Sequence, residues 1–190
     1  MSIRAIVHKV VSKAGQSVSK RIKKIKGIKR PFEGFSVPVS SGVRLNLGCG
    51  HDYREGFINV DSSGTRCDVH CDLVGDNLPF EDKSVDYILA SHLLEHLPDF
   101  GKIMNECHRV LKQGGIFDII VPAPCEAFWR DPTHIRPYTA TTFSIYCMLP
   151  KDSPYATYLG LEPWAGCSTR KQVENYNGDD LHVLYVRMTR

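Results

Sequence analysis

Four apolar segments of the sequence each end in residues that could bind a ligand. The segments lie within 43–47, 57–60, 67–73 and 85–90, and the residues at their ends are Gly48-Cys49-Gly50, Asp61, Asp72 and Ser91-His92. Glycines let the backbone approach a ligand without an intervening side chain, and carboxylates accept hydrogen bonds from hydroxyl groups such as those of a ribose. Because ligands of open parallel sheets bind at the carboxyl ends of the strands, this spacing predicts one shared site.

A second group of reactive side chains follows the apolar run 116–121. Residues 129–138 read Trp-Arg-Asp-Pro-Thr-His-Ile-Arg-Pro-Tyr and are dense in groups that bind ligands or move protons. His134 is the first choice as a general base, since an unperturbed imidazole titrates near neutral pH, and His92 is the second. An acceptor molecule is expected to contact Trp129, Asp131, Arg136 and Tyr138. The alternative is a rigid, proline-framed loop without a binding role.

A third pattern suggests a metal. His92-Leu93-Leu94-Glu95-His96 matches the His-x-x-Glu-His sequence of inverted zinc proteases. On an α-helix its two histidines would face one metal ion, and Glu162 or Glu174 could be a distant third ligand. The segment 67–71 (Cys-Asp-Val-His-Cys) also contains ligand types, but no second ligand pair follows at zinc-site spacing. A zinc hydrolase is therefore an alternative function, while the preferred interpretation assigns no metal.

The elements that must position these residues alternate between strand and helix. The clearest helix begins after Asp99, a suitable N-cap, and Gly114-Gly115 is expected to end it. Thr139 is expected to cap another helix, and Asn177-Gly178 between two apolar runs predicts a β-hairpin. The pattern predicts an α/β protein with three layers: a Rossmann-like, mostly parallel sheet with an antiparallel C-terminal hairpin strand, covered by helices.

The first crossover of this sheet is unusually short. Only residues 51–56 separate Gly50 from Phe57, whereas a parallel crossover normally takes about a dozen residues or more. Six extended residues reach ~20 Å, and a return along a four-residue strand needs only ~13 Å. We therefore expect a connection that contains no normal helix and that leaves part of one sheet face for the N-terminal segment to cover.

The charge of the chain is unevenly distributed. Residues 1–30 contain ten lysines and arginines and no acidic residue, whereas 31–190 contain 14 basic and all 21 acidic residues. Apolar residues in 1–25 recur every three or four positions, which predicts a basic amphipathic helix. Such a helix can lie on an anionic membrane, contact RNA or dock on a partner; the alternative is a solvated, partly disordered tail. We expect residues 1–35 to form this extension with its linker, and 36–190 to form one domain.

Composition and cysteine content limit the class of protein. A hydrophobic content of 42% and a charged content of 24% exclude global disorder, collagen and a coiled-coil rod. No run approaches the ~18 apolar residues of a membrane span. Seven irregularly spaced cysteines and no visible secretory signal favour a reducing compartment. The expected location is cytoplasmic, peripheral to a membrane if the basic extension binds one.

From its motifs, the sequence resembles the class I S-adenosylmethionine-dependent methyltransferases, in particular small enzymes of methyltransferase type 11. The resemblance covers roughly 43–122. Six segments carry it in the family's order: 45–50, 59–61, 71–73 leading to 78–80, 80–88, 91–97 and 109–115. There are two departures, since Asp52 occupies the place of a usual third glycine and Asn46 stands where an acidic residue is common.

The resemblance implies S-adenosylmethionine as the cofactor and assigns roles at the strand ends. The implied cofactor-binding residues are Gly48, Cys49, Gly50, Asp61, Ser62, Asp72, Leu73 and Ser91. The two glycines would lie against the methionine moiety, and Asp61 would hold the ribose. Asp72 with Leu73 would contact the adenine, Ser91 with His92 would border the methyl group, and Cys49 would be a small filler.

The expected activity is methyl transfer to an oxygen or nitrogen of a small-molecule or glycan acceptor. The sulfonium is already an activated leaving group, so the protein has mainly to align the acceptor, exclude water and remove a proton. A nicotinamide dehydrogenase is disfavoured, because Tyr53 stands at the third glycine position and Asp61 follows Gly50 by eleven residues, not ~20. A zinc hydrolase and a non-catalytic basic adaptor for an anionic surface remain as alternatives.

Overall fold

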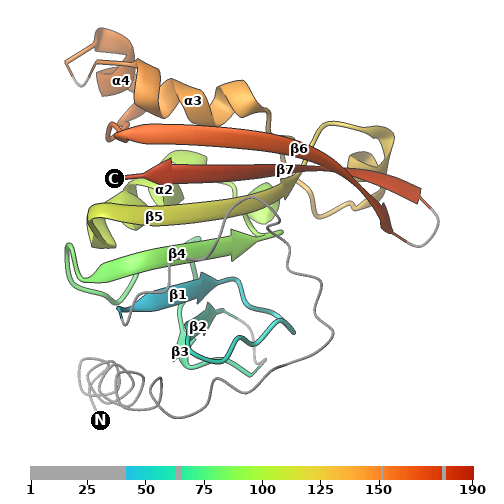
Figure 1. Ribbon diagram of the computed structural model, residues 1–190, viewed down its shortest axis with the longest axis horizontal. Coiled ribbons are helices and arrows are strands. Elements are labelled where there is room, and N and C mark those ends of the chain that lie inside the picture. Colours follow the sequence, from blue (N-terminus) through green and yellow to red (C-terminus); the bar gives the residue numbers. More distant parts are fainter. Residues whose placement is uncertain (1–41, 63–65, 151, 177–178) are drawn as a thin grey trace.

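The computed structural model describes residues 42–62, 66–150, 152–176 and 179–190. Within these ranges the strands form one sheet in the order β3-β2-β1-β4-β5-β7-β6 (Figure 1). The first five strands are parallel: β1 (Arg44–Leu47), β2 (Ile58–Asp61), β3 (Val69–His70), β4 (Val85–Ser91) and β5 (Leu111–Pro122). The hairpin strands β6 (Gly166–Tyr176) and β7 (Asp179–Thr189) are antiparallel to each other, and β7 is antiparallel to β5. The predicted α/β class, with a mostly parallel sheet and an antiparallel C-terminal hairpin, is therefore confirmed, whereas the predicted third layer is not seen among the described residues.

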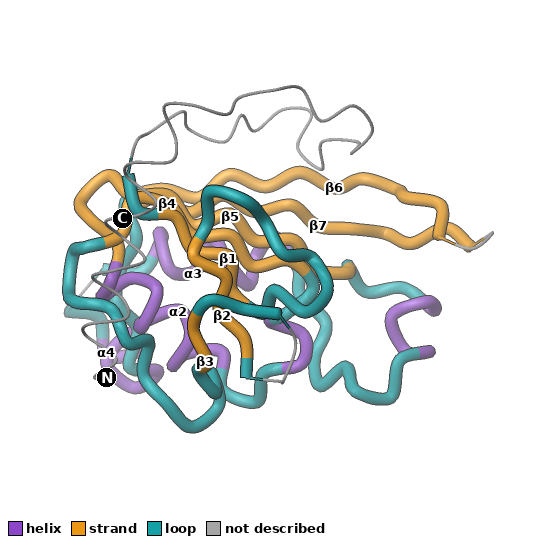
Figure 2. Tube along the Cα trace, turned by 90° about the horizontal axis from the view of Figure 1, so that it is seen from below, coloured by secondary structure: helices purple, strands orange, loops and turns teal. Residues whose placement is uncertain are grey.

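Two helices, α2 (Phe100–Val110) and α3 (Ala140–Met148), lie on the same side of the sheet (Figure 2). The main hydrophobic core lies between them and the sheet and includes Leu47, Met104 and Phe143, all fully buried. The remaining helical elements are α4 (Pro154–Leu159) and the 3-10 turns η1 (Leu94–His96) and η2 (Glu126–Arg130). The predicted covering of the opposite face by residues 1–30, and the predicted boundary after residue 35, fall outside the described residues.

The helix starts follow the sequence signals, whereas one predicted helix end is wrong. Asp99 caps α2 by accepting a hydrogen bond from the Lys102 amide at 2.9 Å, and Thr139 caps α3 in a capping box. However, α2 ends at Val110 and not at Gly114-Gly115. From Leu111 the chain is extended and pairs with β4, and the two glycines lie within β5 where the register between β4 and β5 shifts.

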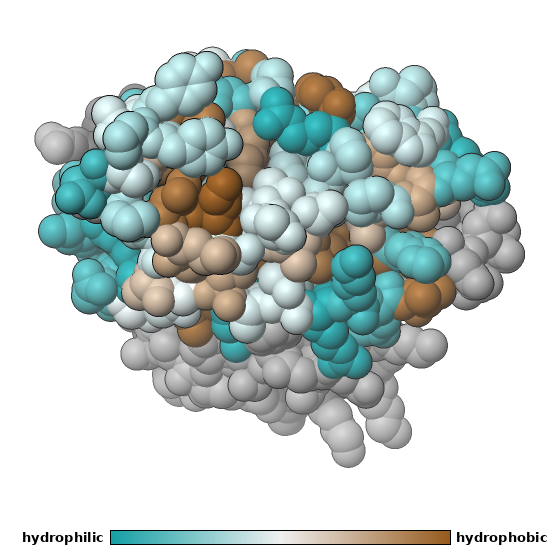
Figure 3. Space-filling model, turned by 90° about the horizontal axis from the view of Figure 1, so that it is seen from above, coloured by the Kyte–Doolittle hydropathy of each residue, from teal (hydrophilic) through white to brown (hydrophobic). Residues whose placement is uncertain are grey.

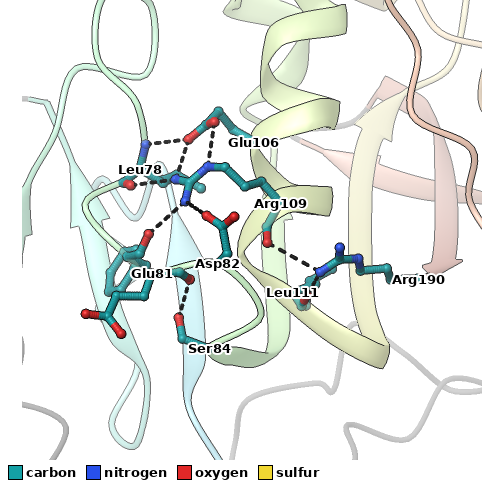
Figure 4. Close-up of polar contacts among 9 residues, drawn as sticks. Leu78, Glu81, Asp82, Ser84, Glu106, Arg109, Leu111 and Arg190 are labelled. Atoms are coloured by element: carbon teal, nitrogen blue, oxygen red, sulfur yellow. Dashed lines mark hydrogen bonds and ion pairs between the residues drawn. The ribbon is translucent and has the colours of Figure 1, made fainter.

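Arg109 near the end of α2 fixes the connection that leads into β4 (Figure 4). Its guanidinium donates to both carboxylate oxygens of Glu106, at 2.9 and 2.8 Å, and to Asp82 at 2.7 Å. It also donates to the carbonyl oxygens of Leu78 and Phe80, each at 3.0 Å. Burial opposes ionisation of Glu106, but its hydrogen bonds outweigh this effect, so the pKa of Glu106 lies below its ordinary value. The network thereby places the start of β4.

The surface around α3 and α4 carries several exposed apolar side chains. Met148, Tyr155 and Tyr158 are exposed there. Figure 3, which looks at the molecule from the side of α3, α4 and β6, shows apolar groups between hydrophilic ones. Over the residues that the structure describes, no helix has both the length and the apolar character needed to cross a membrane.

The expected short crossover between β1 and β2 is present and contains no helix. A buried asparagine organises it. The Asn59 backbone amide and side-chain nitrogen donate to the same oxygen of Asp68, at 2.8 and 2.9 Å. Its side-chain oxygen accepts from the Arg54 amide at 2.9 Å, and its side-chain nitrogen donates back to the Arg54 carbonyl at 3.0 Å. The Asn59 side chain thus pairs with both the amide and the carbonyl of Arg54, as the backbone of a neighbouring strand would.

Asn46 on β1 completes this network. Its side-chain nitrogen donates to the Asn59 side-chain oxygen at 3.0 Å and to the Asp52 carbonyl at 2.8 Å. Both of these acceptors require a hydrogen-bond donor at residue 46, and an ionised carboxylate has no N–H or O–H to donate. The short loop therefore explains why an asparagine stands where the resemblance leads us to expect an acidic residue.

We predict that Asn46→Asp lowers the free energy of unfolding by about 2–3 kcal/mol at pH 7, because a buried charge would face two acceptors. Burial raises the folded-state pKa of such a carboxyl, so the loss should grow above the unfolded pKa of about 3.9 and fade below it. Urea unfolding at pH 7 and at acidic pH measures both effects. Asn77→Asp, on an exposed side chain, is the matched control, and equal losses for the two variants would contradict the role of Asn46.

Candidate functional site

The loop after β1 has glycine at two positions with left-handed backbone. The φ angles are +61° at Gly48 and +47° at Gly50. A Cβ atom at position 48 would lie 2.6 Å from Cδ1 of Leu93, whereas one at position 50 would meet no atom of the described residues within 4 Å. Gly48 is thus needed for close packing against the segment after β4. Among the described residues, none blocks the position of a side chain at Gly50, so a ligand can approach the backbone there.

The ends of β1 and β2 are joined at this loop. The Gly50 amide donates to Oδ2 of Asp61, the last residue of β2, at 2.7 Å. The Cys49 amide donates to the Val60 carbonyl at 3.2 Å. The Cys49 side chain is buried, and its burial raises the pKa of the thiol to about 11, so it remains neutral and acts in packing. The exposed Ser62 follows directly after the strand.

Asp72 and Leu73 lie in the turn after β3. The Asp72 carbonyl accepts from the Asp76 amide at 2.7 Å, and its side chain accepts from the Val74 amide at 3.0 Å. Asp72 is exposed and Leu73 is buried. The Cys71 amide donates to the Asp61 carbonyl at 3.1 Å, which connects this turn to the end of β2.

The end of β4 has an unusual backbone. Ser91 is the last residue of the strand, and His92 has a left-handed φ of 51° that is uncommon for a residue other than glycine. The His92 amide donates to the Ile120 carbonyl of β5 at 2.8 Å, which holds this conformation. Backbone strain of this kind is concentrated at functional sites.

Glu95, three residues later, is fully buried. His92 Nδ1 lies 3.4 Å from its Oε1, within ion-pair distance if the ring is protonated but without hydrogen-bond geometry. Neither carboxylate oxygen has a hydrogen-bond partner among the described residues. The sequence places Glu95 in the zinc pattern and in the segment 91–97 of the resemblance but assigns it no role; its position inside the run Leu93-Leu94-Glu95-His96-Leu97 is the signal that it is buried.

The inverted zinc-protease geometry predicted as an alternative is not formed. The segment makes only a 3-10 turn over Leu94–His96, and the left-handed His92 interrupts any α-helix through the pattern. His92 and His96 are therefore not one α-helical turn apart. Among the described residues, the side chains that gather as potential metal ligands are instead Glu95, His96 and His134.

The predicted acceptor segment separates into surface and core residues. Trp129, Asp131 and Arg136 are exposed. Hydrogen bonds from the side chain and the amide of Thr133 hold the pKa of Asp131 below its ordinary value. Tyr138 was predicted to contact an acceptor, but it lies in the core: it is fully buried, and its hydroxyl donates to the Leu94 carbonyl at 3.0 Å.

The acceptor segment lies against the segment that follows β4. The Ile135 amide donates to the Glu95 carbonyl at 2.7 Å. The ring centroids of His96 and His134 are 4.9 Å apart. The acceptor segment is thus a neighbour of the turn that follows Ser91 and His92, and His92 and His134 both lie near Glu95.

Comparisons with known proteins agree with this geometry. Residues 45–119 match the family model of a methyltransferase domain. Over 70 residues, the chain is 40% identical to a demethylmenaquinone methyltransferase of Staphylococcus epidermidis, covering 35% of this chain and 29% of that protein. Over 92 residues it is 34% identical to a "Probable S-adenosylmethionine-dependent methyltransferase" of Mycolicibacterium smegmatis, covering 47% and 35%.

The fold is shared with solved structures. A methyltransferase dependent on S-adenosylmethionine from Archaeoglobus fulgidus superposes with a TM-score of 0.56 at 17% identity, covering 78% of this chain and 86% of that chain. The chain spans only about a third of the length of the curated relatives above. The expected resemblance to methyltransferases is confirmed for the matched segment 45–119, and the solved structure shares the fold of this chain.

We predict that replacing each of the two loop glycines by alanine lowers the free energy of unfolding by different amounts. Gly48→Ala should lower the free energy of unfolding by about 3 kcal/mol, since left-handed strain of about 1–2 kcal/mol adds to overpacking against Leu93. Gly50→Ala should cost only the strain of about 1–2 kcal/mol. Urea unfolding of both variants beside the unmodified protein measures the difference, and a Gly50 variant as unstable as the Gly48 variant would refute this view of the loop.

Proposed function

We propose that this chain transfers the methyl group of S-adenosylmethionine to an oxygen or nitrogen of a small-molecule or glycan acceptor. The observation that carries the proposal is the contact between the open Gly50 loop and the Asp61 carboxylate at 2.7 Å. It puts a backbone surface without a side chain beside a carboxylate, which suits the methionine moiety and the ribose of the cofactor. The matched methyltransferase segment supports the same conclusion.

The cofactor roles follow the order of the strand ends. The Gly48–Gly50 loop lies against the methionine moiety, and Asp61 holds the ribose hydroxyls. An ionised carboxylate has about four lone-pair sites, so the bond from Gly50 does not exhaust it. Asp72 with Leu73 borders the adenine, and Ser91 lies toward the methyl group.

The acceptor lies between the end of β4 and the segment 129–136. Exposed Trp129, Asp131 and Arg136 provide aromatic, acidic and basic contacts for it. His134 and His92 are the predicted bases that remove its proton. The protein's part is to hold acceptor and cofactor in line and to exclude water, since the sulfonium already supplies the leaving group.

We expect S-adenosylmethionine to bind with a dissociation constant of about 1 µM to 1 mM, the usual range of KM. Asp61→Asn should weaken binding at least about tenfold through loss of a charge-assisted hydrogen bond, while the amide oxygen can still accept from Gly50 and preserve the loop. Isothermal titration calorimetry measures both, with Asp152→Asn on an exposed side chain as the control. Absence of binding by the unmodified protein would overturn the proposal in favour of a non-catalytic basic adaptor.

We also propose that the basic segment 1–30 binds an anionic membrane surface and gives a cytoplasmic protein a peripheral membrane location. Its ten basic and no acidic residues support this, since each basic residue near an anionic surface contributes about 1 kcal/mol. We predict sedimentation with vesicles containing phosphatidylserine that weakens as salt rises and is lost on deletion of residues 1–30. Binding to RNA but not to vesicles would assign the segment to RNA.

A further inference from the structure

Glu95, His96 and His134 form a cluster that the methyl-transfer chemistry does not require. One potential ligand atom from each residue lies within 4.8 Å of the other two. The three come from two places in the chain, the 3-10 turn after β4 and the loop after η2. The hydrogen bond from the Ile135 amide to the Glu95 carbonyl, at 2.7 Å, holds these two places together.

The carboxylate is the first observation that points to a ligand. Glu95 is fully buried, and both of its oxygens are without a hydrogen-bond partner among the described residues. A buried charge is strongly unfavourable unless it is paired or coordinates a metal. His92 Nδ1 at 3.4 Å is the nearest candidate for an ion pair, but it reaches only one of the two oxygens and its side chain is partly exposed.

The two histidines are held as metal ligands usually are. Nδ1 of His134 lies 2.8 Å from the Phe128 carbonyl oxygen, which fixes it as the protonated nitrogen and leaves Nε2 with a lone pair. Nδ1 of His96 lies 3.3 Å from the Thr133 carbonyl and 3.0 Å from the Thr133 hydroxyl, with the same consequence. A ligating histidine almost always donates its other ring N–H to an outer partner of this kind, which orients the ring.

We propose that Glu95, His96 and His134 bind a divalent transition-metal ion, with Zn²⁺ as the best match. Two imidazoles and one carboxylate are the protein ligands of a type of zinc site that keeps a fourth position open. With bonds of about 2.1 Å, the ligand atoms of a tetrahedral site are about 3.4 Å apart. Binding therefore draws the three side chains together from their present separation of up to 4.8 Å.

The place of the cluster gives the ion a role that rests on the proposed function. Glu95 follows His92 at the end of β4, and Leu93 between them packs against Gly48 of the proposed cofactor loop. An ion here would lie beside the segment proposed to contact the acceptor, and at its open position it could bind an acceptor hydroxyl and favour loss of the hydroxyl proton. The assignment removes His134 from the set of predicted bases, since its Nε2 becomes a ligand.

Metal content and affinity of the full-length protein test the site. The protein is stripped with a chelator, and Zn²⁺ is titrated in competition with a chromophoric chelator; Co²⁺ is then used as a spectroscopic probe of coordination. We expect one tight site per chain and tetrahedral Co²⁺ absorption. His96→Ala, His134→Ala and Glu95→Gln should each weaken Zn²⁺ binding by at least about 100-fold. The reason is that removal of a residue that only hydrogen-bonds a metal ligand already lowers metal affinity about 10- to 100-fold.

The control variant is His70→Ala, which removes the imidazole 3.3 Å from the Cys67 thiol and leaves the cluster intact. It should bind Zn²⁺ like the unmodified protein. A loss on His70→Ala with unchanged binding by Glu95→Gln, or no tight site at all, would overturn the proposal. Because the Glu95→Gln side chain has nearly the same shape as glutamate, its result does not depend on a refolded loop.

Cofactor binding without zinc binding would refute the metal site alone, and zinc binding without cofactor binding would refute the proposed function alone.

Discussion

The arrangement of the site depends on the hydrogen bonds of one buried side chain, Asn59. A parallel crossover normally contains a helix, which satisfies its own backbone groups and covers the sheet. Here the chain returns without one, so the loop needs other partners for its polar groups. Asn59 provides them by bonding to Arg54 on one side and Asp68 on the other. Asn46 adds a bond from the neighbouring strand.

This network determines where the ligand-binding groups lie. Asn59 is two residues before Asp61, and Asn46 is two residues before Gly48, so each side chain of the network is on the strand that carries a site residue. β1 and β2 are in register there, with Asn46 opposite Asn59. The same register brings the Gly50 amide to the Asp61 carboxylate. The polar bonds that replace the crossover helix thus also align the loop with the acid.

The sequence predicts the strand ends well because they depend on local patterns. Apolar runs followed by glycine or ending in aspartate mark the ends of β1 and β2, although β3 is shorter than expected and ends at His70, before Asp72. Asp99 and Thr139 cap helices through bonds to nearby backbone. The end of α2 was misplaced because β4 pairs with Leu111, a contact between distant parts of the chain. Tyr138 was misplaced for a similar reason: a tyrosine in a polar segment gives no local sign that its ring packs against Phe100 and Phe143.

The zinc pattern shows that residue types and spacing alone do not determine which side chains lie together. Spacing of i and i+4 pairs two histidines only if the segment is an α-helix, and the left-handed His92 removes that condition. The structure instead places His96 beside His134, which is 38 residues further along the chain, with their ring centroids 4.9 Å apart. The acidic residue of the pattern turns inward and is buried.

A buried carboxylate needs a compensating positive charge or a proton, and the two neighbouring imidazoles can supply that compensation only if they are protonated or share a cation with it. The local turn after β4 therefore disrupts the protease motif. It also buries a carboxylate that needs a compensating positive charge, at the place where the acceptor is expected.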